Sequence, residues 1–466
     1  MSASTDIRLP PGPGSPRRVN GALFLAARIR AFRRWHEQFG DIYFVDIANF
    51  GPTVVIRGAE LHRKVFTAKA NILHAGDNAL GRTLGPGSIF SMDEDQHLAE
   101  RRKLLPPFHG ERMRSYESLV EAEANREMDR WPVDEPFPTL KSFNSITLRV
   151  ILRAVFGAEG KELAELEQII PPITRYGQMR VASSLLMRDY GRFSPGGRGE
   201  RLMTRFHEII RTLIDKHLAD PGLADRIDIL ALMLNSDLQE GRAVDYQATG
   251  EELMTILVAG HETTASSLAW NIERITRHPE VLDRLTAEAR TDQNEYRLAV
   301  INEVLRTRPV IGMTGRSVFA ESFELDGWKL PAGTRILCNI RETNVDPSAH
   351  PEADRFNPDR YVGKKPDTYS WIPFGGGLRR CLGAAFAQME MDIVLRTLLR
   401  RFDLAATSRP PSTSTSGSAL WARAMSCVTP GRPAVPMTPV TPRRDSGRRQ
   451  RMPRKPAARL WTTGCS

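Results

Sequence analysis

The chain of 466 residues, 41% hydrophobic and 26% charged, can bury a large core, which excludes a disordered or fibrous protein. Its net charge of +10 resides in residues 409–466, which hold eleven Lys and Arg and one Asp, so the basicity does not characterise the main domain. Four cysteines without CxxC spacing argue against a disulfide framework, and no apolar run reaches the roughly eighteen residues of a membrane span.

The first predicted elements are a lead-in, a helix and a hairpin. Residues 1–20 are polar and rich in proline, which predicts a stiff lead-in without a folded element. Apolar spacing predicts an amphipathic helix around 24–39, and two alternating stretches, 42–47 and 53–56, predict a hairpin. The glycine-rich stretch 68–90 has little periodicity, so we expect a long loop, of the kind that is usually functional or mobile.

A basic pair follows this loop. His97 and Arg101 are spaced i and i+4, which places them on one face of a helix, where they could bind a carboxylate together. A solvated basic face is the alternative. It is favoured while these two residues are considered alone, because the spacing is a weak pattern.

A long helix is predicted from about residue 250 to 277. Thr249 and Glu252 have the spacing of a capping box at its start, and His278-Pro279 ends it. At 1.5 Å per residue the helix would be about 40 Å long, enough to cross a whole domain.

The middle of this helix is polar where a core helix is usually apolar. Ala259 and Thr263 lie one turn apart on one face, and Gly260 and Glu262 stand between them in the sequence. A small residue one turn before a hydroxyl leaves space for a diatomic ligand beside a hydrogen-bond donor, and Glu262 could relay protons through water. The alternative is a loosened helix whose threonines bond back to carbonyls four residues earlier.

Two further elements follow the long helix. Glu303 and Arg306 are one turn apart and, taken alone, could form a surface ion pair worth about 0.2–0.5 kcal/mol. Residues 323–334 predict a hairpin with Asp326-Gly327 at its turn, and a strand is predicted over 335–340.

The stretch 374–383, Phe-Gly-Gly-Gly-Leu-Arg-Arg-Cys-Leu-Gly, presents one cysteine at the start of a helix. A helix N-terminus carries partial positive charge and favours the thiolate of Cys381, which would be a good metal ligand. The glycines leave room for a flat, bulky group against the backbone, and Arg379 suits an anionic group at its rim. The alternative is a glycine-rich turn with an inert, buried cysteine.

This stretch resembles the pattern F-x-x-G-x-R-x-C-x-G of the cytochromes P450, the haem-thiolate monooxygenases, and it matches at every fixed position: Phe374, Gly377, Arg379, Cys381 and Gly383. Residues 259–264 match the family pattern A-G-x-[DE]-T-[TS], 303–306 match its ExxR motif, and 358–361 match its P-x-R-[FY] segment. Together with the basic pair, these matches extend the resemblance from residue 40 to residue 404.

The resemblance implies a mainly α-helical cytochrome P450 fold with a smaller β region over residues 21–408, in which the long helix crosses the haem and the cysteine loop lies on the opposite face. It implies haem b (iron protoporphyrin IX, or heme) with the Cys381 thiolate as axial ligand. The cofactor contacts carried over from the family are His97, Arg101, Ala259, Gly260, Arg316, Phe374, Gly377, Arg379 and Gly383. A buried network that specifies the fold would comprise Glu303, Arg306 and Arg360.

The activity implied by the resemblance is the insertion of one oxygen atom from O2 into a hydrophobic small molecule such as a lipid, steroid or terpenoid. Thr263 and Glu262 are the expected catalytic residues and would manage protons. The chain has no flavin or iron–sulfur signature, so electrons would come from a ferredoxin or flavodoxin with its NAD(P)H reductase. A candidate docking patch comprises Arg102, Lys103 and Arg380, although these charges could equally serve only to solvate the surface.

The expected cellular location follows from targeting signals that the sequence lacks. The N-terminus lacks the apolar region of a signal peptide, and the cysteines suit a reducing compartment. We therefore expect a cytoplasmic protein, whose membrane contact, if there is any, is peripheral.

Residues 409–466 depart from the family, which normally ends with a β-hairpin after the segment 401–404. Nine prolines with many Ser and Thr residues predict disorder. The stretch is either a genuine basic tail or, as we slightly prefer, an altered C-terminus that replaced the hairpin. The alternative function is therefore a haem- or ligand-binding protein with little or no turnover. Nucleic-acid binding by the tail is the least favoured hypothesis.

Overall fold

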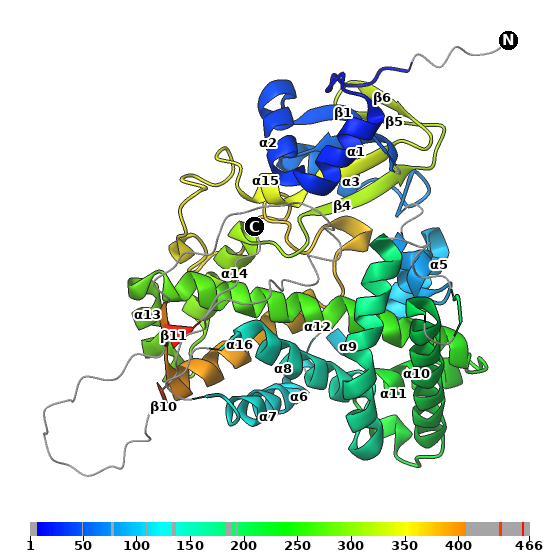
Figure 1. The fold of residues 1–466 in the computed structure, drawn as a ribbon, viewed down its shortest axis with the longest axis vertical. Coiled ribbons are helices and arrows are strands. Elements are labelled where there is room, and N and C mark those ends of the chain that lie inside the picture. Colours follow the sequence, from blue (N-terminus) through cyan, green and yellow to red (C-terminus); the bar gives the residue numbers. More distant parts are fainter. Residues whose placement is uncertain are drawn as a thin grey trace, which may run out of the picture.

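The computed structural model describes residues 7–406, apart from 49, 76–78, 109, 111, 133–136, 183–188 and 192–193, together with 438–439 and 459–460. Most of these residues are helical, and a smaller β region lies at one end of the molecule (Figure 1). The predicted fold class, mainly α with a smaller β region, is confirmed.

The helices of the first half are α1 (Arg17–Ala26), α2 (Arg28–Phe39), α3 (Ala59–Phe66), α4 (Ala79–Leu84), α5 (Glu94–Leu104), α6 (Arg112–Ser115), α7 (Glu117–Met128), α8 (Thr139–Ala154), α9 (Gly160–Ala182) and α10 (Pro195–Leu218). Those of the second half are α11 (Ile229–Gln239), α12 (Tyr246–Thr276), α13 (Pro279–Ala289), α14 (Glu295–Thr307), α15 (Ile340–Asn344) and α16 (Ala384–Arg401). Short 3-10 helices are η1 (Ile89–Ser91), η2 (Pro106–Phe108), η3 (Leu223–Asp225), η4 (Pro358–Arg360) and η5 (Gly377–Arg379). Within the described part of the chain, no helix has the length and apolarity that crossing a membrane requires.

The main sheet has the strand order β1 (Ile42–Ile47), β2 (Gly51–Ile56), β7 (Arg335–Asn339), β4 (Met313–Val318) and β3 (Leu73–His74). Its neighbours are antiparallel except β2 and β7, which are parallel. Successive side chains point to opposite faces of the sheet. Val54 and Ile56 therefore belong to one apolar cluster, while Val55 packs with Phe32 and Trp35 of α2 in another.

Both predicted hairpins are present. The strands β1 and β2 pair in antiparallel register, with Tyr43 opposite Val55. The second hairpin joins β5 (Ser322–Leu325) to β6 (Trp328–Pro331). At its turn Asp326 has φ 55° and Gly327 has φ 80°, the left-handed conformation that Asp-Gly turns favour.

The helix α12 crosses the helical part of the molecule from side to side (Figure 1). It packs closely against α8, because a Cβ on Gly260 would lie only 2.4 Å from Cδ1 of Ile151. The hydroxyl of Thr147, also on α8, donates to the carbonyl oxygen of His261 at 3.0 Å. The middle of α12 is therefore held in place by α8.

The start of the chain differs from the prediction. Two helices, α1 and α2, replace the single predicted helix, because the backbone breaks at Ala27, which has φ −142°. The region expected to be a lead-in is also partly ordered. Phe44 donates its N–H to the carbonyl oxygen of Pro11 at 2.9 Å, Arg8 forms a bridge with Lys329, and α1 already begins at residue 17.

The start of α12 also differs from the prediction. The helix begins at residue 246, where the side chain of Asp245 accepts hydrogen bonds from the N–H groups of Gln247 and Ala248, both at 3.0 Å. The capping box predicted at Thr249 and Glu252 is therefore wrong, since an aspartate one turn earlier supplies the cap.

The stretch 68–90, predicted to be a long loop, contains β3, α4 and η1. Of residues 409–466, only two short strands are described. The strand β10 (Thr438–Pro439) pairs with β8 (Phe402–Asp403), and β11 (Arg459–Leu460) pairs with β9 (Ala405–Ala406). The predicted disorder of the other residues in this stretch concerns positions outside the described ranges.

Candidate functional site

The cysteine loop is held by its own backbone and by close packing on α3. The N–H of Cys381 donates to the carbonyl oxygen of Phe374 at 3.0 Å. Gly377 has φ 65°, and a Cβ there would lie 2.1 Å from the carbonyl oxygen of Phe66. A Cβ on Gly376 would lie 2.1 Å from the ring of the same phenylalanine. These glycines are therefore required by packing against α3 and by backbone conformation.

Cys381 presents an accessible thiol just before Gly383, which caps α16. Desolvation by the neighbouring protein raises the pKa of the Cys381 thiol, although the residue is exposed. The N–H of Gly383 and the charges of Arg101 and Arg380 lower this pKa by less. Desolvation is thus the largest influence on the thiol in the absence of a bound group, and the thiolate form of Cys381 stays a prediction. A cation bound at the sulfur would reverse this balance.

Arg379 joins the cysteine loop to the segment before α5. Its guanidinium donates to the carbonyl oxygens of Ile89, at 3.2 Å, and Met92, and it forms an ion pair with Asp93. The arginine is thus held at the base of the helix that carries the basic pair.

His97 and Arg316 approach Arg379 from two other elements, α5 and β4. All three side chains line one cavity together with Phe66 and Leu378. The pKa of His97 is lowered to about 4, first by burial and then by the positive charges of Arg379 and Arg101. His97 is therefore neutral at neutral pH and can act there as a hydrogen-bond donor.

The arginines of this cluster are short of negative charge. Arg316 is 7% exposed and donates to the carbonyl oxygens of Gly315, at 2.7 Å, and Gly376, at 3.2 Å. Burial lowers the pKa of Arg316, and it likewise lowers the pKa of Arg101. Hydrogen bonds to neutral carbonyls do not balance these charges, so the cluster suits an anionic ligand.

The middle of α12 combines an accessible alanine with a hydroxyl. Ala259 is exposed, although its neighbours two residues away, Leu257 and His261, are buried. The hydroxyl of Thr263 donates to the carbonyl oxygen of Ala259 at 2.7 Å. The back-bonding expected under the alternative reading therefore occurs, but α12 remains one continuous helix.

The other two predicted residues of this segment lie differently. Glu262 is half-buried. Gly260 lies at the contact with Ile151 of α8, so its missing side chain serves helix packing. The structure brings Ala259 and Thr263 to one side of the helix and gives Gly260 a role in packing that the motif did not indicate.

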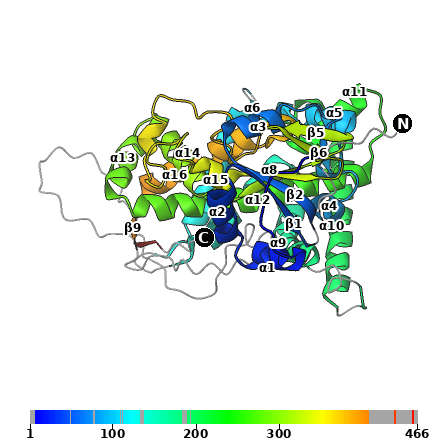
Figure 2. The same cartoon turned by 90° about the horizontal axis from the view of Figure 1, so that it is seen from above.

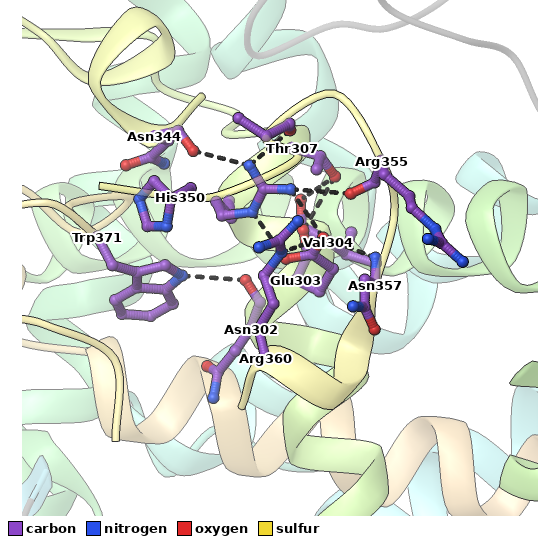
Figure 3. A network of polar contacts seen from close by, with 12 residues as sticks. Asn302, Glu303, Val304, Thr307, Asn344, His350, Arg355, Asn357, Arg360 and Trp371 are labelled. Atoms are coloured by element: carbon purple, nitrogen blue, oxygen red, sulfur yellow. Dashed lines mark hydrogen bonds and ion pairs between the residues drawn. The ribbon is translucent and has the colours of Figure 1, made fainter. Parts of the chain in front are cut away.

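The third group of predicted residues forms a buried network (Figure 3). Arg306 pairs with Glu303 through two contacts of 2.7 Å, and neither side chain is exposed. Arg360 Nε lies 3.5 Å from Oε1 of Glu303, which also accepts from the N–H of Asn357 at 2.8 Å. The structure thus brings Glu303, Arg306 and Arg360 together in the interior.

The residues present fit a haem. The Cys381 thiol is an accessible soft ligand suited to iron, and it lies in the field of Arg101. The buried cluster of His97, Arg316 and Arg379 offers donors and positive charge for the two propionate carboxylates of such a group. Buried positive charge without a partner destabilises an ordinary protein core. An anionic, iron-containing group would bind both the thiol and the positive cluster.

Sequence reasoning missed two contributors. Phe66 packs closely against Gly376 and Gly377 of the cysteine loop. Asp93 forms an ion pair with Arg379, which is 286 residues away in the sequence. Both residues lie in unremarkable local sequence, and their contacts are long-range, so no motif indicated them.

Comparison with known proteins agrees with this chemistry. The family model described as cytochrome P450 matches residues 10–424. A putative cytochrome P450 138 from Mycobacterium tuberculosis is 44% identical over 402 residues, which cover 86% of this chain and 91% of that protein. The putative cytochrome P450 137 of the same species is 33% identical over 415 residues, which cover 86% of this chain and 87% of that protein.

Solved structures share the fold. A retinoic acid bound cyanobacterial CYP120A1 superposes with a TM-score of 0.73 at 23% identity and covers 85% of this chain and 93% of that chain. The heme domain of cytochrome P450DA gives a TM-score of 0.72 at 20% identity, covering 85% of this chain and 92% of that chain. At these identities the likeness concerns the fold alone.

Proposed function

The chain belongs to the cytochrome P450 family of haem-thiolate monooxygenases, whose members bind haem b through a cysteine thiolate, and we propose that Cys381 is this ligand here. The observation that carries the proposal is the accessible thiol at the end of the glycine loop, in the field of Arg101 and Arg380. Cys338 is the other cysteine with a described side chain. It is fully buried, and burial raises the pKa of its thiol to about 12, which makes it a poor ligand.

We assign the propionates of the haem to His97, Arg101, Arg316 and Arg379. The support is the convergence of His97, Arg316 and Arg379 from α5, β4 and the cysteine loop on one cavity, with the charge of Arg101 near Arg379. Burial also makes the excess of positive charge unfavourable. Because Arg379 already pairs with Asp93, this arginine would share its donors between the carboxylate of Asp93 and a propionate of the haem.

When bound, the haem supplies the redox chemistry that divides O2, so that two electrons and two protons are consumed, one oxygen atom enters the substrate and the other leaves as water. The chain's own residues orient the reactants and hold protons. The Thr263 hydroxyl donates to the carbonyl oxygen of Ala259 at 2.7 Å, so its oxygen is free to accept a hydrogen bond on the accessible side of α12. Glu262, one residue earlier, is the carboxylate proposed to exchange protons with it.

Electrons would arrive from a ferredoxin or flavodoxin with its reductase. Arg102 and Arg380 are exposed and suit an acidic partner. Lys103, predicted as part of the same patch, is less exposed than these two arginines. Its amino group lies 3.1 Å from a carboxylate oxygen of Asp237. This ion pair engages its charge, so the proposed docking patch is reduced to the two arginines.

The substrate proposed is a hydrophobic small molecule. The turn 310–313 after α14 is half-buried and carries apolar side chains in three of its four positions, as expected of a segment that borders a substrate pocket. We place the protein in the cytoplasm, a proposal supported by the free thiols of Cys338 and Cys381.

Turnover tests the proposal. The purified protein, supplied with NADPH, a ferredoxin and its reductase, should consume O2 and oxidise a hydrophobic test substrate, and Arg380→Glu should raise the ferredoxin concentration needed for half-maximal rate. A matched exposed change far from the loop, Arg290→Glu, should not. Ligand-induced spectral shifts without any product would instead support the alternative, a family member that binds but does not turn over.

A further inference from the structure

Two acidic residues, Asp93 and Glu94, line the same cavity as His97, Arg316 and Arg379, which we call the propionate cluster. Both acids lie where α5 begins, and in both views α5 lies where the helical part of the molecule meets the β region (Figures 1 and 2). The acids therefore share a cavity with the three residues that offer donors and positive charge to a haem propionate.

Asp93 occupies the position of a helix N-cap without acting as one. Its backbone is extended, with φ −130° and ψ 174°, as an N-cap requires, but among the described residues its side chain accepts no hydrogen bond from the first turn of α5. The carboxylate instead accepts hydrogen bonds from the N–H of Ala75, at 2.9 Å, and from the guanidinium of Arg379. Contacts with two distant segments thus replace the local contact that an aspartate usually makes here.

His74 holds both acids from the side of the sheet. Its Nε2 lies 2.8 Å from Oε1 of Glu94, and its Nδ1 lies 3.8 Å from Oδ2 of Asp93. The imidazole stacks on the ring of Phe319, with 3.8 Å between the ring centroids. The strand β3, which carries His74, pairs with β4, which carries the arginine of the propionate cluster that belongs to the sheet. The acids are therefore fixed by elements other than their own helix.

The backbone next to Asp93 is strained. Glu94 has φ 47°, a left-handed conformation that costs a non-glycine residue energy and persists only where the surrounding structure enforces it. Strain of this kind gathers at functional sites. Here it occurs where the chain enters α5 with both carboxylates at the cavity.

Arg379 is oriented by the segment that contains Asp93. Its guanidinium donates to the carbonyl oxygens of Ile89 and Met92 as well as to the carboxylate of Asp93. Three of its five N–H donors are thereby engaged, and Asp93 is the one charged acceptor among these three. The segment thus sets the direction of the guanidinium and leaves the other donors for a propionate.

The negative charge of Asp93 acts on every member of the propionate cluster. Burial lowers the pKa values of His97, Arg316 and Arg379, and the charge of Asp93 opposes this lowering in all three. Glu94 lies against His74 instead, and its side chain is 45% exposed, against 28% for Asp93. Asp93 is therefore the carboxylate whose charge the whole cluster shares.

We propose that Asp93 is the counterion of the propionate cluster and thereby sets the reduction potential of the bound haem. This inference rests on the proposed function, because the cluster is the one assigned to the propionates. A negative charge near the haem favours iron(III), which carries one more positive charge than iron(II), so Asp93 makes the haem harder to reduce. Asp93 acts through Arg379 and its neighbours, so it is a positioning residue and takes no part in substrate oxidation.

The test is a redox titration of the full-length, haem-loaded protein, in which one electron from dithionite reduces each iron(III) to iron(II). Asp93→Asn removes the charge and keeps an acceptor for the N–H of Ala75. Its midpoint potential should become more positive, equivalent to an increase of about threefold or more in the equilibrium constant for reduction. Asp93→Ser, whose hydroxyl can cap α5, should shift the potential in the same direction. Asp93→Glu keeps the charge and should retain the unmodified potential.

Asp95→Asn is the matched control, because it removes the same charge from the first turn of α5 at an exposed position. Solvent and salt at about 0.15 M screen this charge, so the potential should not change. Circular dichroism and the spectrum of the reduced, CO-saturated protein check folding and ligation on the same samples.

Unmodified potentials in Asp93→Asn and Asp93→Ser would overturn the counterion role, and so would an equal shift in Asp93→Glu, since shape rather than charge would then matter. Failure of both neutral variants to bind haem would overturn it as well, because Asp93 would then serve haem binding itself. Each of these results leaves the proposed function standing. A haem-loaded unmodified protein without the thiolate spectrum would instead contradict the proposed function.

Discussion

The guanidinium of Arg306 lies against the carboxylate of Glu303, with both N–O distances at 2.7 Å and neither side chain exposed. Arg306 also donates to the carbonyl oxygens of Asn344, at 2.9 Å, and Ala353, at 2.8 Å. The pair therefore connects α14 to the end of α15 and to the irregular segment that precedes η4, which supports a structural role for it.

Replacement of Arg306 by Met should lower the free energy of unfolding by about 3–5 kcal/mol, because the buried carboxylate of Glu303 loses its two short contacts and keeps only the longer one to Arg360, at 3.5 Å, and the N–H of Asn357. Urea denaturation measures the effect. Arg355→Gln is the matched control, since its pair with Glu352 spans 3.6 Å between side chains that are 68% and 66% exposed, and the loss should stay below about 1 kcal/mol. Equal losses in the two variants would contradict a structural role specific to the buried pair.

Gly377→Ala should distort the cysteine loop and reduce haem binding. The left-handed backbone alone costs an alanine about 1–2 kcal/mol, and the added methyl group would also collide with the carbonyl oxygen of Phe66. The ratio of haem to protein after purification reports the effect. Gly333→Ala isolates the backbone cost, because Gly333 has φ 82° but no atom near its Cβ position, and this variant should keep its haem. Normal haem content in Gly377→Ala would show that the loop tolerates a side chain.

Glu390 on α16 is buried, and neither carboxylate oxygen has a partner among the residues described. Burial raises the pKa of its carboxyl from 4.5 to about 8. The folded protein therefore keeps this proton to higher pH than the unfolded chain does. The contribution to stability is fully present below pH 4.5 and is lost as the pH rises toward 8, by up to about 1.4 kcal/mol per pH unit.

Glu390→Gln should remove this pH dependence of stability. The free energy of unfolding of the variant, minus that of the unmodified protein, should therefore increase between pH 5 and pH 8, by about 1.4 kcal/mol or less per pH unit. Urea unfolding at several pH values measures it. Glu324→Gln, at an exposed position of β5, should show the same pH dependence of stability as the unmodified protein. A Glu390→Gln profile that also runs parallel would mean that the carboxyl titrates normally.

Thr263→Ala should leave haem binding intact and lower the amount of product formed per NADPH consumed, because the hydroxyl proposed to hold a proton is gone. Its only described acceptors are the carbonyl oxygens of Ala259, at 2.7 Å, and Gly260, at 3.3 Å, so the fold should tolerate the change. Thr276→Ala, a buried threonine of the same helix that also bonds back to a carbonyl, is the control. An unchanged yield per NADPH would remove Thr263 from the mechanism.

Local spacing predicted much of the fold and the site. The Asp326-Gly327 turn, the strand at β7 and the long helix α12 follow from residues close together in sequence, and so does the placement of Cys381 in a glycine loop before a helix. Burial and long-range contacts set the rest. Lys103 is paired with Asp237, 134 residues away, and the raised pKa of Cys381 depends on the protein around it. Such effects leave no trace in the local pattern, since their partners come from other elements.

The most direct test of the account is the absorption spectrum of the purified protein, reduced and saturated with carbon monoxide, beside that of Cys381→Ala. We predict the strongly red-shifted Soret band of a thiolate-ligated carbonyl in the unmodified protein and its loss in the variant, with Cys338→Ala unaffected. A band that persists in Cys381→Ala, or that never forms in a haem-loaded protein, would contradict the assignment of Cys381 as the iron ligand.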